Sequence, residues 1–217
     1  MKLVNGVAQE ASISDIVTLT RAGQATRISR NGDIRVAKND ELRYDYTNGK
    51  RQLLTEGPST NLLRQSVTLF GPGWNIAGQG GAAANLNLNA MGLFPGVQIA
   101  SGGADWHRLR SGTLPTVVSG TSYVLWAYYR AGSSKRARIV FRNGTGGVET
   151  YAAGNVGDLQ LQDRAASSSA GVRNVNLGNG NFFVELRCTA NFSGPVELGF
   201  GPDSIIAGKD VIVLGIS

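Results

Sequence analysis

Residues that could perform catalysis are few in this chain, and no pattern singles them out. His107 is the single histidine, so any Ser-His-Asp or Cys-His arrangement must use it. Ser101 and Ser111 lie nearby, but neither stands in the Gly-x-Ser-x-Gly pattern that exposes a nucleophilic serine. A histidine directly after Trp106 is more typical of a binding or packing position than of a catalytic one.

Carboxylates and the cysteine give no stronger signal. A glycosidase needs two carboxylates across one bond, and no spacing singles out a pair among Glu149, Asp158, Asp163, Glu185 and Glu197. The loop residues Asp158 and Asp163 lack the EF-hand spacing of a calcium site. Cys188, the one cysteine, excludes an internal disulfide, and its strand-like neighbours predict burial. We therefore predict a chain that is not an enzyme and binds no cofactor.

Binding residues are better supported, because polar and aromatic side chains alternate with apolar ones in three segments. These segments are SYVLWAYYR (122–130), RARIVFR (136–142) and FFVELRCT (182–189). Alternate residues of a strand face opposite sides of a sheet. If the three strands share one sheet, one of its faces carries Trp126, Tyr128, Arg130, Arg138, Arg142, Glu185 and Arg187.

Such a face has the chemistry of a carbohydrate site. Flat aromatic rings pack on the C–H faces of sugars, and arginines also pair with carboxylated or sulfated sugars. The same face could instead be a subunit contact or an ordinary solvated surface. Trp106 and His107, on a glycine-rich loop, are a second candidate position, whereas Trp74 is expected to be buried. The predicted carbohydrate-binding residues are Trp126, Tyr128, Arg138, Glu185, Arg187, Trp106 and His107.

The elements that must position these residues are β-strands. No sustained helical periodicity appears, and 30 glycines with 17% charged residues suit short strands joined by tight turns. Clean alternation gives each sheet one apolar side, and two such sheets bury these sides against each other. We therefore predict an all-β fold, a jelly-roll β-sandwich over residues 66–217.

The segment before the sandwich is predicted to contain a short β-hairpin. Asn31-Gly32 lies between candidate strands Ala25–Arg30 and Asp33–Ala37, and Asn-Gly favours a type I′ turn. A lone hairpin is marginal in water, so this leader, residues 1–42, is expected to pack on the sandwich, a second copy or a partner. Residues 43–65 are expected to form an extended connector, where Pro58 excludes a regular helix.

Charge and hydropathy limit the partners. The net charge of +6 favours polyanions, but the positive residues are spaced singly and no nucleic-acid-binding motif is present. No nucleic-acid partner is predicted. The segment MKLVNGVAQEAS lacks the apolar core of a signal peptide, and no run is long enough to span a bilayer. We expect no membrane insertion, and synthesis in a host cytoplasm.

The stretch ATRISRNGDIRVAKNDELRYDYTNGKRQLLTEGPSTNLL, residues 25–63, resembles a segment that recurs in fibre and spike proteins of tailed phages and prophages. The shared order is an Ala-Thr-Arg hairpin, an Arg-x-Asp-Tyr turn and a Leu-Leu run followed by Pro and Thr-Asn-Leu. The later segments SYVLWAYYRAG, GNGNFFVELRCT and VIVLG are similar to further elements of these proteins. Phe182 stands where the family usually has tryptophan. Head-spike proteins of gene transfer agents, which are domesticated phage particles, are similar as well.

The resemblance implies a virion structural protein, usually a homotrimer, with a carbohydrate-binding-module-like jelly roll. It would lie on the surface of a phage or gene transfer agent particle and bind host capsular or surface polysaccharide for adsorption. Its other expected partners are capsid or tail proteins. An alternative is a purely structural spike-base adaptor that joins capsid or tail to another fibre protein without binding glycan. A third hypothesis is a depolymerase that shortens capsule chains.

Overall fold

The structure is a computed structural model of a chain that divides into two compact units, Met1–Ser59 and Thr60–Ser217. It describes residues 2–4, 7–9, 25–31, 34–37, 41, 43–46, 50–53, 74–77, 83–86, 96–106, 108–112 and 114–216. All regular elements among them are β-strands, and none of these residues forms a helix long and apolar enough to cross a membrane. The finer division with a connector over residues 43–65 stays a prediction.

The described residues of the first unit form three two-stranded antiparallel pairs. These are β1 (Lys2–Val4) with β2 (Val7–Gln9), β3 (Ala25–Ile28) with β4 (Ile34–Ala37), and β5 (Tyr44–Asp45) with β6 (Gln52–Leu53). Strand β3 also lies beside β5. The predicted hairpin is therefore present.

The turn of that hairpin differs from the prediction. A two-residue Asn31-Gly32 turn would place Ile28 opposite Arg35, whereas the observed register pairs Ile28 with Ile34 and is centred on Asn31. The connection therefore spans residues 29–33, and both strands are shorter than predicted. The preference of Asn-Gly for a two-residue turn is local, and the register of the paired strands overrides it here.

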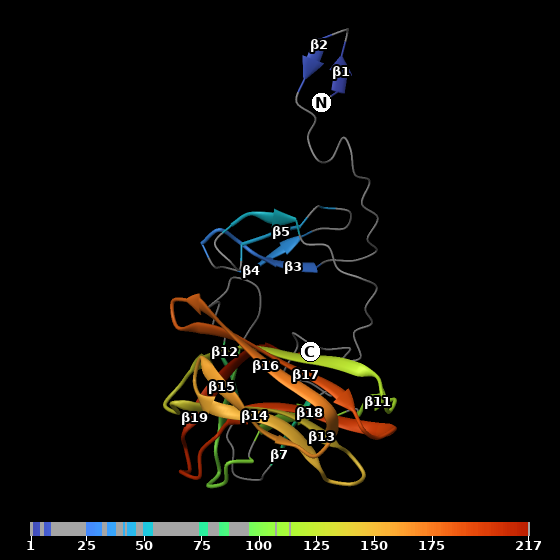
Figure 1. Ribbon diagram of the computed structural model, residues 1–217. Coiled ribbons are helices and arrows are strands. Elements are labelled where there is room, and N and C mark those ends of the chain that lie inside the picture. Colours follow the sequence, from blue (N-terminus) through green and yellow to red (C-terminus); the bar gives the residue numbers. More distant parts are fainter. Residues whose placement is uncertain are drawn as a thin grey trace. The chain divides into compact units, whose positions relative to one another are not determined.

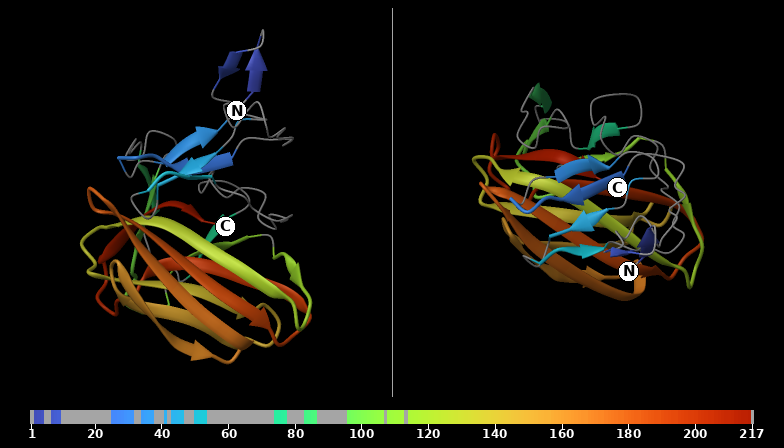
Figure 2. Two further views of the ribbon diagram at one scale, coloured as in Figure 1. Left: turned by 45° about the horizontal axis from the view of Figure 1, so that its top comes forward. Right: turned by 90° about the horizontal axis from the view of Figure 1, so that it is seen from above.

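The second unit is a sandwich of two antiparallel sheets (Figures 1 and 2). Sheet I has seven strands: β15 (Asp158–Arg164), β14 (Glu149–Asn155), β13 (Arg136–Asn143), β18 (Gly194–Pro202), β10 (Arg108–Ser111) and β7 (Trp74–Ala77) in spatial order, with β11 (Thr116–Val117) beside β18. Sheet II has six: β16 (Ser167–Gly178), β17 (Asn181–Ala190), β12 (Ser122–Ala131), β19 (Asp210–Ile216), β9 (Gly96–Ala100) and β8 (Ala83–Leu86).

The strand pairing is that of a jelly roll. Strand β9 pairs with β19, β10 with β18 and β12 with β17, so the first strands pair with the last in nested order. Successive pairs alternate between sheet II and sheet I. A chain folded as one long hairpin and wrapped across two sheets has this order. The all-β, jelly-roll prediction is confirmed.

The core lies between the sheets. Leu125, Ala127 and Tyr129 of β12 are buried while Val124 is exposed, as the alternation predicts. The Tyr129 ring lies 4.7 Å from that of Phe200, which comes from sheet I. Burial raises the pKa of the Tyr129 hydroxyl to about 12, although its oxygen accepts a hydrogen bond from the Gly157 amide. Tyr129 of sheet II and Phe200 of sheet I thus pack against each other in the core between the sheets.

Two further predicted core positions are confirmed. Trp74 and Cys188 are both almost fully buried. Burial raises the pKa of the Cys188 thiol to about 11, which keeps it protonated at neutral pH. Cys188 is therefore a small packing residue rather than a reactive one.

The three alternating segments do not share one sheet, so the condition for a single polar face is not met. Strands β12 and β17 pair in sheet II, but β13 belongs to sheet I. The chain crosses between the sheets at Gly132, where a Cβ would lie 2.6 Å from the Asp210 backbone oxygen. Asp210 holds this corner by accepting hydrogen bonds from the Ser133 amide at 3.0 Å and from Gln98 Nε2 at 2.8 Å. Alternation fixes which side of a strand is apolar, but not which sheet the strand joins.

We predict that Phe200→Ala lowers the free energy of unfolding by about 3–5 kcal/mol, because it opens a cavity at the Tyr129 contact. Urea unfolding followed by tryptophan fluorescence measures this, since all three tryptophans lie in the second unit. The control Val118→Ala, whose side chain is 57% exposed, should change stability by less than about 0.5 kcal/mol. Equal effects of the two changes would contradict the assigned core.

Candidate functional site

The outer face of sheet I gathers charged side chains from four neighbouring strands. Arg142 of β13 lies opposite Glu149 of β14 and opposite Glu197 of β18. Strand β10 adds Arg108 and Arg110 on the other side of β18. These side chains point outward because the alternate residues of their strands fill the core.

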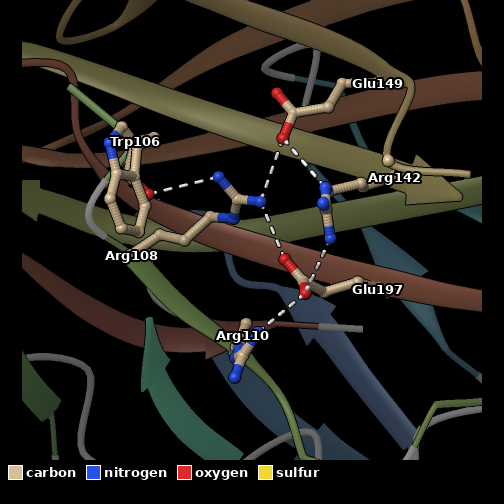
Figure 3. A pocket seen from close by; sticks show the side chains of 7 residues that line it. Trp106, Arg108, Arg110, Arg142, Glu149 and Glu197 are labelled. Carbon is tan, nitrogen blue, oxygen red and sulfur yellow. Dashed lines mark hydrogen bonds and ion pairs between the residues drawn. The ribbon is translucent and has the colours of Figure 1, made fainter. Parts of the chain in front are cut away.

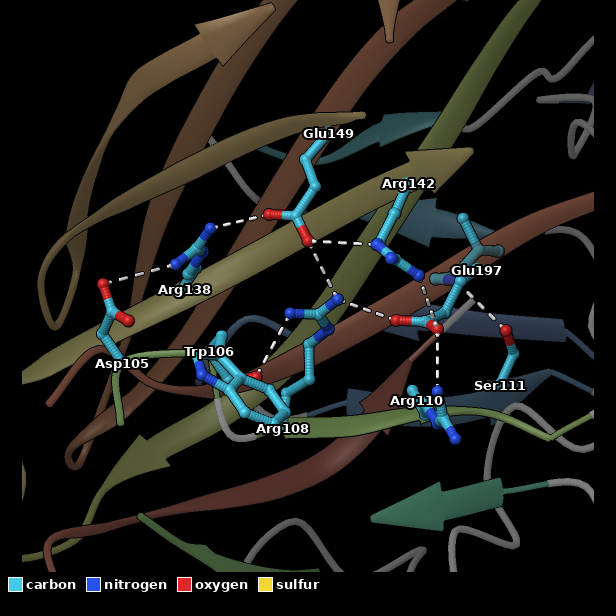
Figure 4. Close-up of polar contacts among 10 residues, drawn as sticks. Asp105, Trp106, Arg108, Arg110, Ser111, Arg138, Arg142, Glu149 and Glu197 are labelled. Atoms are coloured by element: carbon cyan, nitrogen blue, oxygen red, sulfur yellow. Dashed lines mark hydrogen bonds and ion pairs between the residues drawn. The ribbon is translucent and has the colours of Figure 1, made fainter. Parts of the chain in front are cut away.

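The charges form one connected network (Figure 4). The Arg108 guanidinium donates to Glu197 at 2.7 Å and to Glu149 at 3.1 Å, so it bridges both carboxylates. Arg110 pairs with Glu197 at 3.1 Å, and Arg142 reaches both carboxylates at 3.5 Å. The network holds Glu197 between three guanidinium groups, and every described acceptor in it is a carboxylate or backbone oxygen.

Burial makes the central pair strong and costly to break. The side chains of Arg108 and Glu197 are only 6% and 5% exposed. Burial by itself raises the pKa of the Glu197 carboxyl, but hydrogen bonds and charge from Arg108 and Arg110 outweigh it and hold the pKa below its usual value. Glu197 is therefore ionised at neutral pH. A general acid for glycoside cleavage needs the opposite shift.

Two local features fix the arginine stems. A Cβ at Gly199 would lie 2.7 Å from Arg108 Cδ. Because Gly199 has no side chain, the Arg108 side chain can occupy this space where it crosses β18. The Arg138 guanidinium stacks 3.7 Å from the centre of the Tyr151 ring and donates to Glu149 at 2.7 Å. Both contacts hold guanidinium groups in set orientations before any ligand binds.

A pocket of about 320 Å³ opens beside this network (Figure 3). Its lining residues are Trp106, Arg108, Arg110, Arg142, Gly147, Glu149 and Glu197. The Trp106 residue is 48% exposed, and the side chains of Arg110 and Arg142 are 42% and 32% exposed. The pocket therefore offers an indole ring, two accessible guanidinium groups and oriented carboxylates.

The loop that carries Trp106 is tied to the sandwich at several points. The Ser101 hydroxyl donates to the Ser204 carbonyl at 2.6 Å and accepts from the Gly103 amide. Arg108 donates to the Trp106 carbonyl at 3.2 Å. These contacts hold the loop beside the pocket. They also occupy Ser101, which excludes it as a free nucleophile.

The other residues considered for chemistry have structural roles. The Ser111 hydroxyl is buried and accepts from the Leu198 amide at 3.1 Å. Asp163 accepts two turn amides, and Asp158 accepts from the Gln160 side chain. Among the residues that the structure describes, no group of three or more His, Cys, Asp or Glu side chains could hold a metal ion.

The predicted binding residues fall on two different sheets. Arg138 and Trp106 lie with the sheet I network, where Arg138 pairs with Glu149 and, at 3.6 Å, with Asp105. The other described members, Trp126, Tyr128, Glu185 and Arg187, lie on the outer face of sheet II. His107 lies outside the described residues.

The sheet II group is an aromatic patch whose rings pack on one another. Trp126 and Tyr128 have ring centres 5.1 Å apart, and Phe183 lies 5.0 Å from Tyr128. Glu185, opposite Trp126 in the register, pairs with Arg187 at 2.5 Å. The patch is partly exposed, and its rings already pack edge-on or tilted against one another.

Sequence reasoning missed Arg108 and Arg110 altogether. The segment RLRS does alternate, with two arginines flanking the buried Leu109, so a short strand with one charged face was a usable signal. Arg142, Glu149 and Glu197 were each considered, but not as one cluster. Nothing in their spacing shows that β10, β13, β14 and β18 lie side by side.

Comparisons with known proteins give no family. No protein-family model and no curated protein matches the chain. One similar solved structure is the CBM22-1–GH10 part of Clostridium thermocellum endo-1,4-β-D-xylanase 10B with xylohexaose, at 11% identity and TM-score 0.40, covering 67% of this chain and 25% of that chain. Another is TmCBM61 with β-1,4-galactotriose, at 12% identity and TM-score 0.36, covering 73% of this chain and 97% of that chain. Likenesses at this level identify no ligand for this chain.

We predict that Glu197→Gln destabilises the sandwich by about 3 kcal/mol at pH 7, because it leaves the buried Arg108 with reduced compensation. The pKa of Glu197 is lower in the folded than in the unfolded chain, so its stabilisation is complete above about pH 4.3 and is lost as pH falls through the folded value. The difference between variant and wild type should therefore shrink from pH 7 to pH 3 in urea unfolding.

The control for this experiment is Asp105→Asn, an exposed partner in the same network, which should cost less than about 1 kcal/mol. A destabilisation by Glu197→Gln that stayed constant from pH 7 to pH 3 would contradict the ionised state of Glu197.

We also predict that Gly199→Ala displaces Arg108, since the added methyl group occupies the position of its side chain. Stability should fall by about 1–3 kcal/mol, the usual cost of overpacking. The matched control is Gly171→Ala on sheet II, where a Cβ meets nothing within 4 Å. A crystal structure of Gly199→Ala with Arg108 unmoved would disprove this packing role.

Proposed function

We propose that this chain is a glycan-binding structural subunit of a spike or fibre on a phage-like particle, and that the sheet I pocket contacts the sugar. The observation that carries the proposal is the exposed Trp106 beside a pocket whose guanidinium and carboxylate groups are already oriented. Sugars are bound by an aromatic surface together with a few well-placed polar groups, and the pocket has both. No chemical step is assigned to the site.

The charge of the pocket favours an acidic sugar. Its lining carries three arginines, Arg108, Arg110 and Arg142, against two glutamates, so one positive charge is in excess. Arg110 and Arg142 keep accessible edges, and a planar guanidinium binds carboxylate or sulfate groups through two parallel hydrogen bonds. The ligand proposed is therefore a capsular or surface polysaccharide with carboxylated or sulfated residues.

The particle is proposed from the sequence resemblance of residues 25–63 and the later segments to phage and gene transfer agent proteins. On this proposal the chain lies on the virion surface, contacts capsid or tail proteins through its first unit, and forms a homotrimer. The first unit supports such contacts, because its described elements are two-stranded pairs, which are marginally stable alone.

A second candidate function is the spike-base adaptor without glycan affinity. The aromatic patch of Trp126, Tyr128 and Phe183 favours it, since partly exposed aromatic residues are enriched at protein contacts. The two functions use opposite faces of the sandwich, so one pair of matched variants separates them.

We predict that Trp106→Ala lowers affinity for the host polysaccharide by about tenfold or more, because it removes the stacking surface while leaving the charge network. Glycan-array binding and particle adsorption to capsulated cells measure this. Trp126→Ala is the matched control and should leave both unchanged. A loss of affinity with Trp126→Ala alone would show that the glycan binds on sheet II. Unchanged affinity in both variants would disprove the site on sheet I.

A further inference from the structure

Strand β15 is the outer strand of sheet I on one side of the sandwich. Among the residues that the structure describes, it pairs with β14 alone, so its other edge has no strand neighbour there. An open strand edge presents backbone N–H and C=O groups that can pair with a strand of another molecule. Strand β16, the outer strand of sheet II, lies beside β15.

A side chain of β16 takes the place of the missing strand. The Leu159 amide donates to Asn174 Oδ1 at 3.0 Å, and Asn174 Nδ2 donates to the Leu159 carbonyl at 2.9 Å. Two residues that face each other in an antiparallel ladder exchange the same two hydrogen bonds. The carboxamide of Asn174 therefore pairs with Leu159 as a residue of a neighbouring strand would, and it links the edges of the two sheets.

The position of Asn174 in its own strand is one that favours an apolar residue. Asn174 lies opposite Val184, and Val172, the inward residue before it, lies opposite Leu186. Val184 and Leu186 are buried in the core, so this row of β16 faces the inside of the sandwich. A polar side chain at such a position is costly unless it is hydrogen-bonded. The two bonds to Leu159 therefore explain the asparagine, whereas packing alone does not.

The rest of the β15 edge is interrupted as well. A register shift in the β14–β15 pairing leaves Gln162 without a cross-strand partner, and a bulge of this kind disrupts regular pairing. Asp163 Oδ1 then accepts hydrogen bonds from the next two backbone amides, at 2.6 and 3.0 Å. The regularly paired part of β15 is therefore Asp158–Leu161, and Asn174 binds within it.

We propose that Asn174 closes the edge of sheet I and thereby keeps β15 from pairing with a strand of a second copy of this chain. With Asn174 in place, the backbone groups of Leu159 are already bonded and cannot receive an incoming strand. Without it, two copies could join their β15 edges antiparallel around a two-fold axis. The proposal does not rest on the function proposed for the sheet I pocket.

The test uses the full chain with Asn174→Val and, separately, Asn174→Thr. Both new residues have high strand propensity, and neither carries the carboxamide that exchanges both bonds with Leu159. The matched control is Ser169→Val, because Ser169 is exposed on the same strand and its replacement leaves both bonds intact. Near-ultraviolet circular dichroism checks that each variant folds.

We predict that hydrogen exchange at the Leu159 amide, followed by NMR, is about tenfold faster in both Asn174 variants, since the bond that protects it is lost. The mean mass of these variants, measured by light scattering after size exclusion, should rise with concentration above that of the wild type and of Ser169→Val. Adding Gln160→Lys to Asn174→Val should restore the wild-type mass. Gln160 is exposed next to Leu159, and a lysine on an edge strand prevents edge pairing.

Three results would overturn the proposal. Exchange at the Leu159 amide that is as slow as in the wild type would show that Asn174 does not close the edge. Faster exchange without added association would show that the opened edge attracts no second strand. Association that persists after Gln160→Lys is added would place the contact on another surface.

Discussion

The buried ion pair between Arg108 and Glu197 is the interaction on which the candidate site depends. A carboxylate removed from water is stable only where cations and hydrogen bonds compensate it. Glu197 therefore requires Arg108 and Arg110 on one side and Arg142 on the other, and Arg108 extends the network to Glu149. Four strands are cross-linked on their outer face, and the guanidinium groups are oriented before a ligand arrives.

Most of the positive charge in the sheet I pocket is balanced within the protein. Two glutamates lie against three arginines in its lining, so one positive charge is in excess. Arg108 and Glu197 are almost fully buried, whereas Arg110 and Arg142 keep accessible edges.

Glycines make both the fold and the site possible at particular points. Gly132 lets the chain turn sharply against Asp210 and pass from sheet II to sheet I. Gly199 leaves the path for the Arg108 stem across β18. In each case a methyl group would occupy space that another group fills. Part of the high glycine content is thus explained by the close approach of other groups to these two positions.

The sequence by itself determined the all-β class, the core faces of β12 and β17, the burial of Trp74 and Cys188, and the presence of the β3–β4 hairpin. Those features follow from side-chain alternation and residue type, which are local. The tertiary structure alone decided that β13 joins sheet I, that Arg138 is separated from Trp126, and that Arg108 meets Glu197, 89 residues away. Alternation gives each strand an inner and an outer side, but strand partners depend on long-range pairing, which no local pattern encodes.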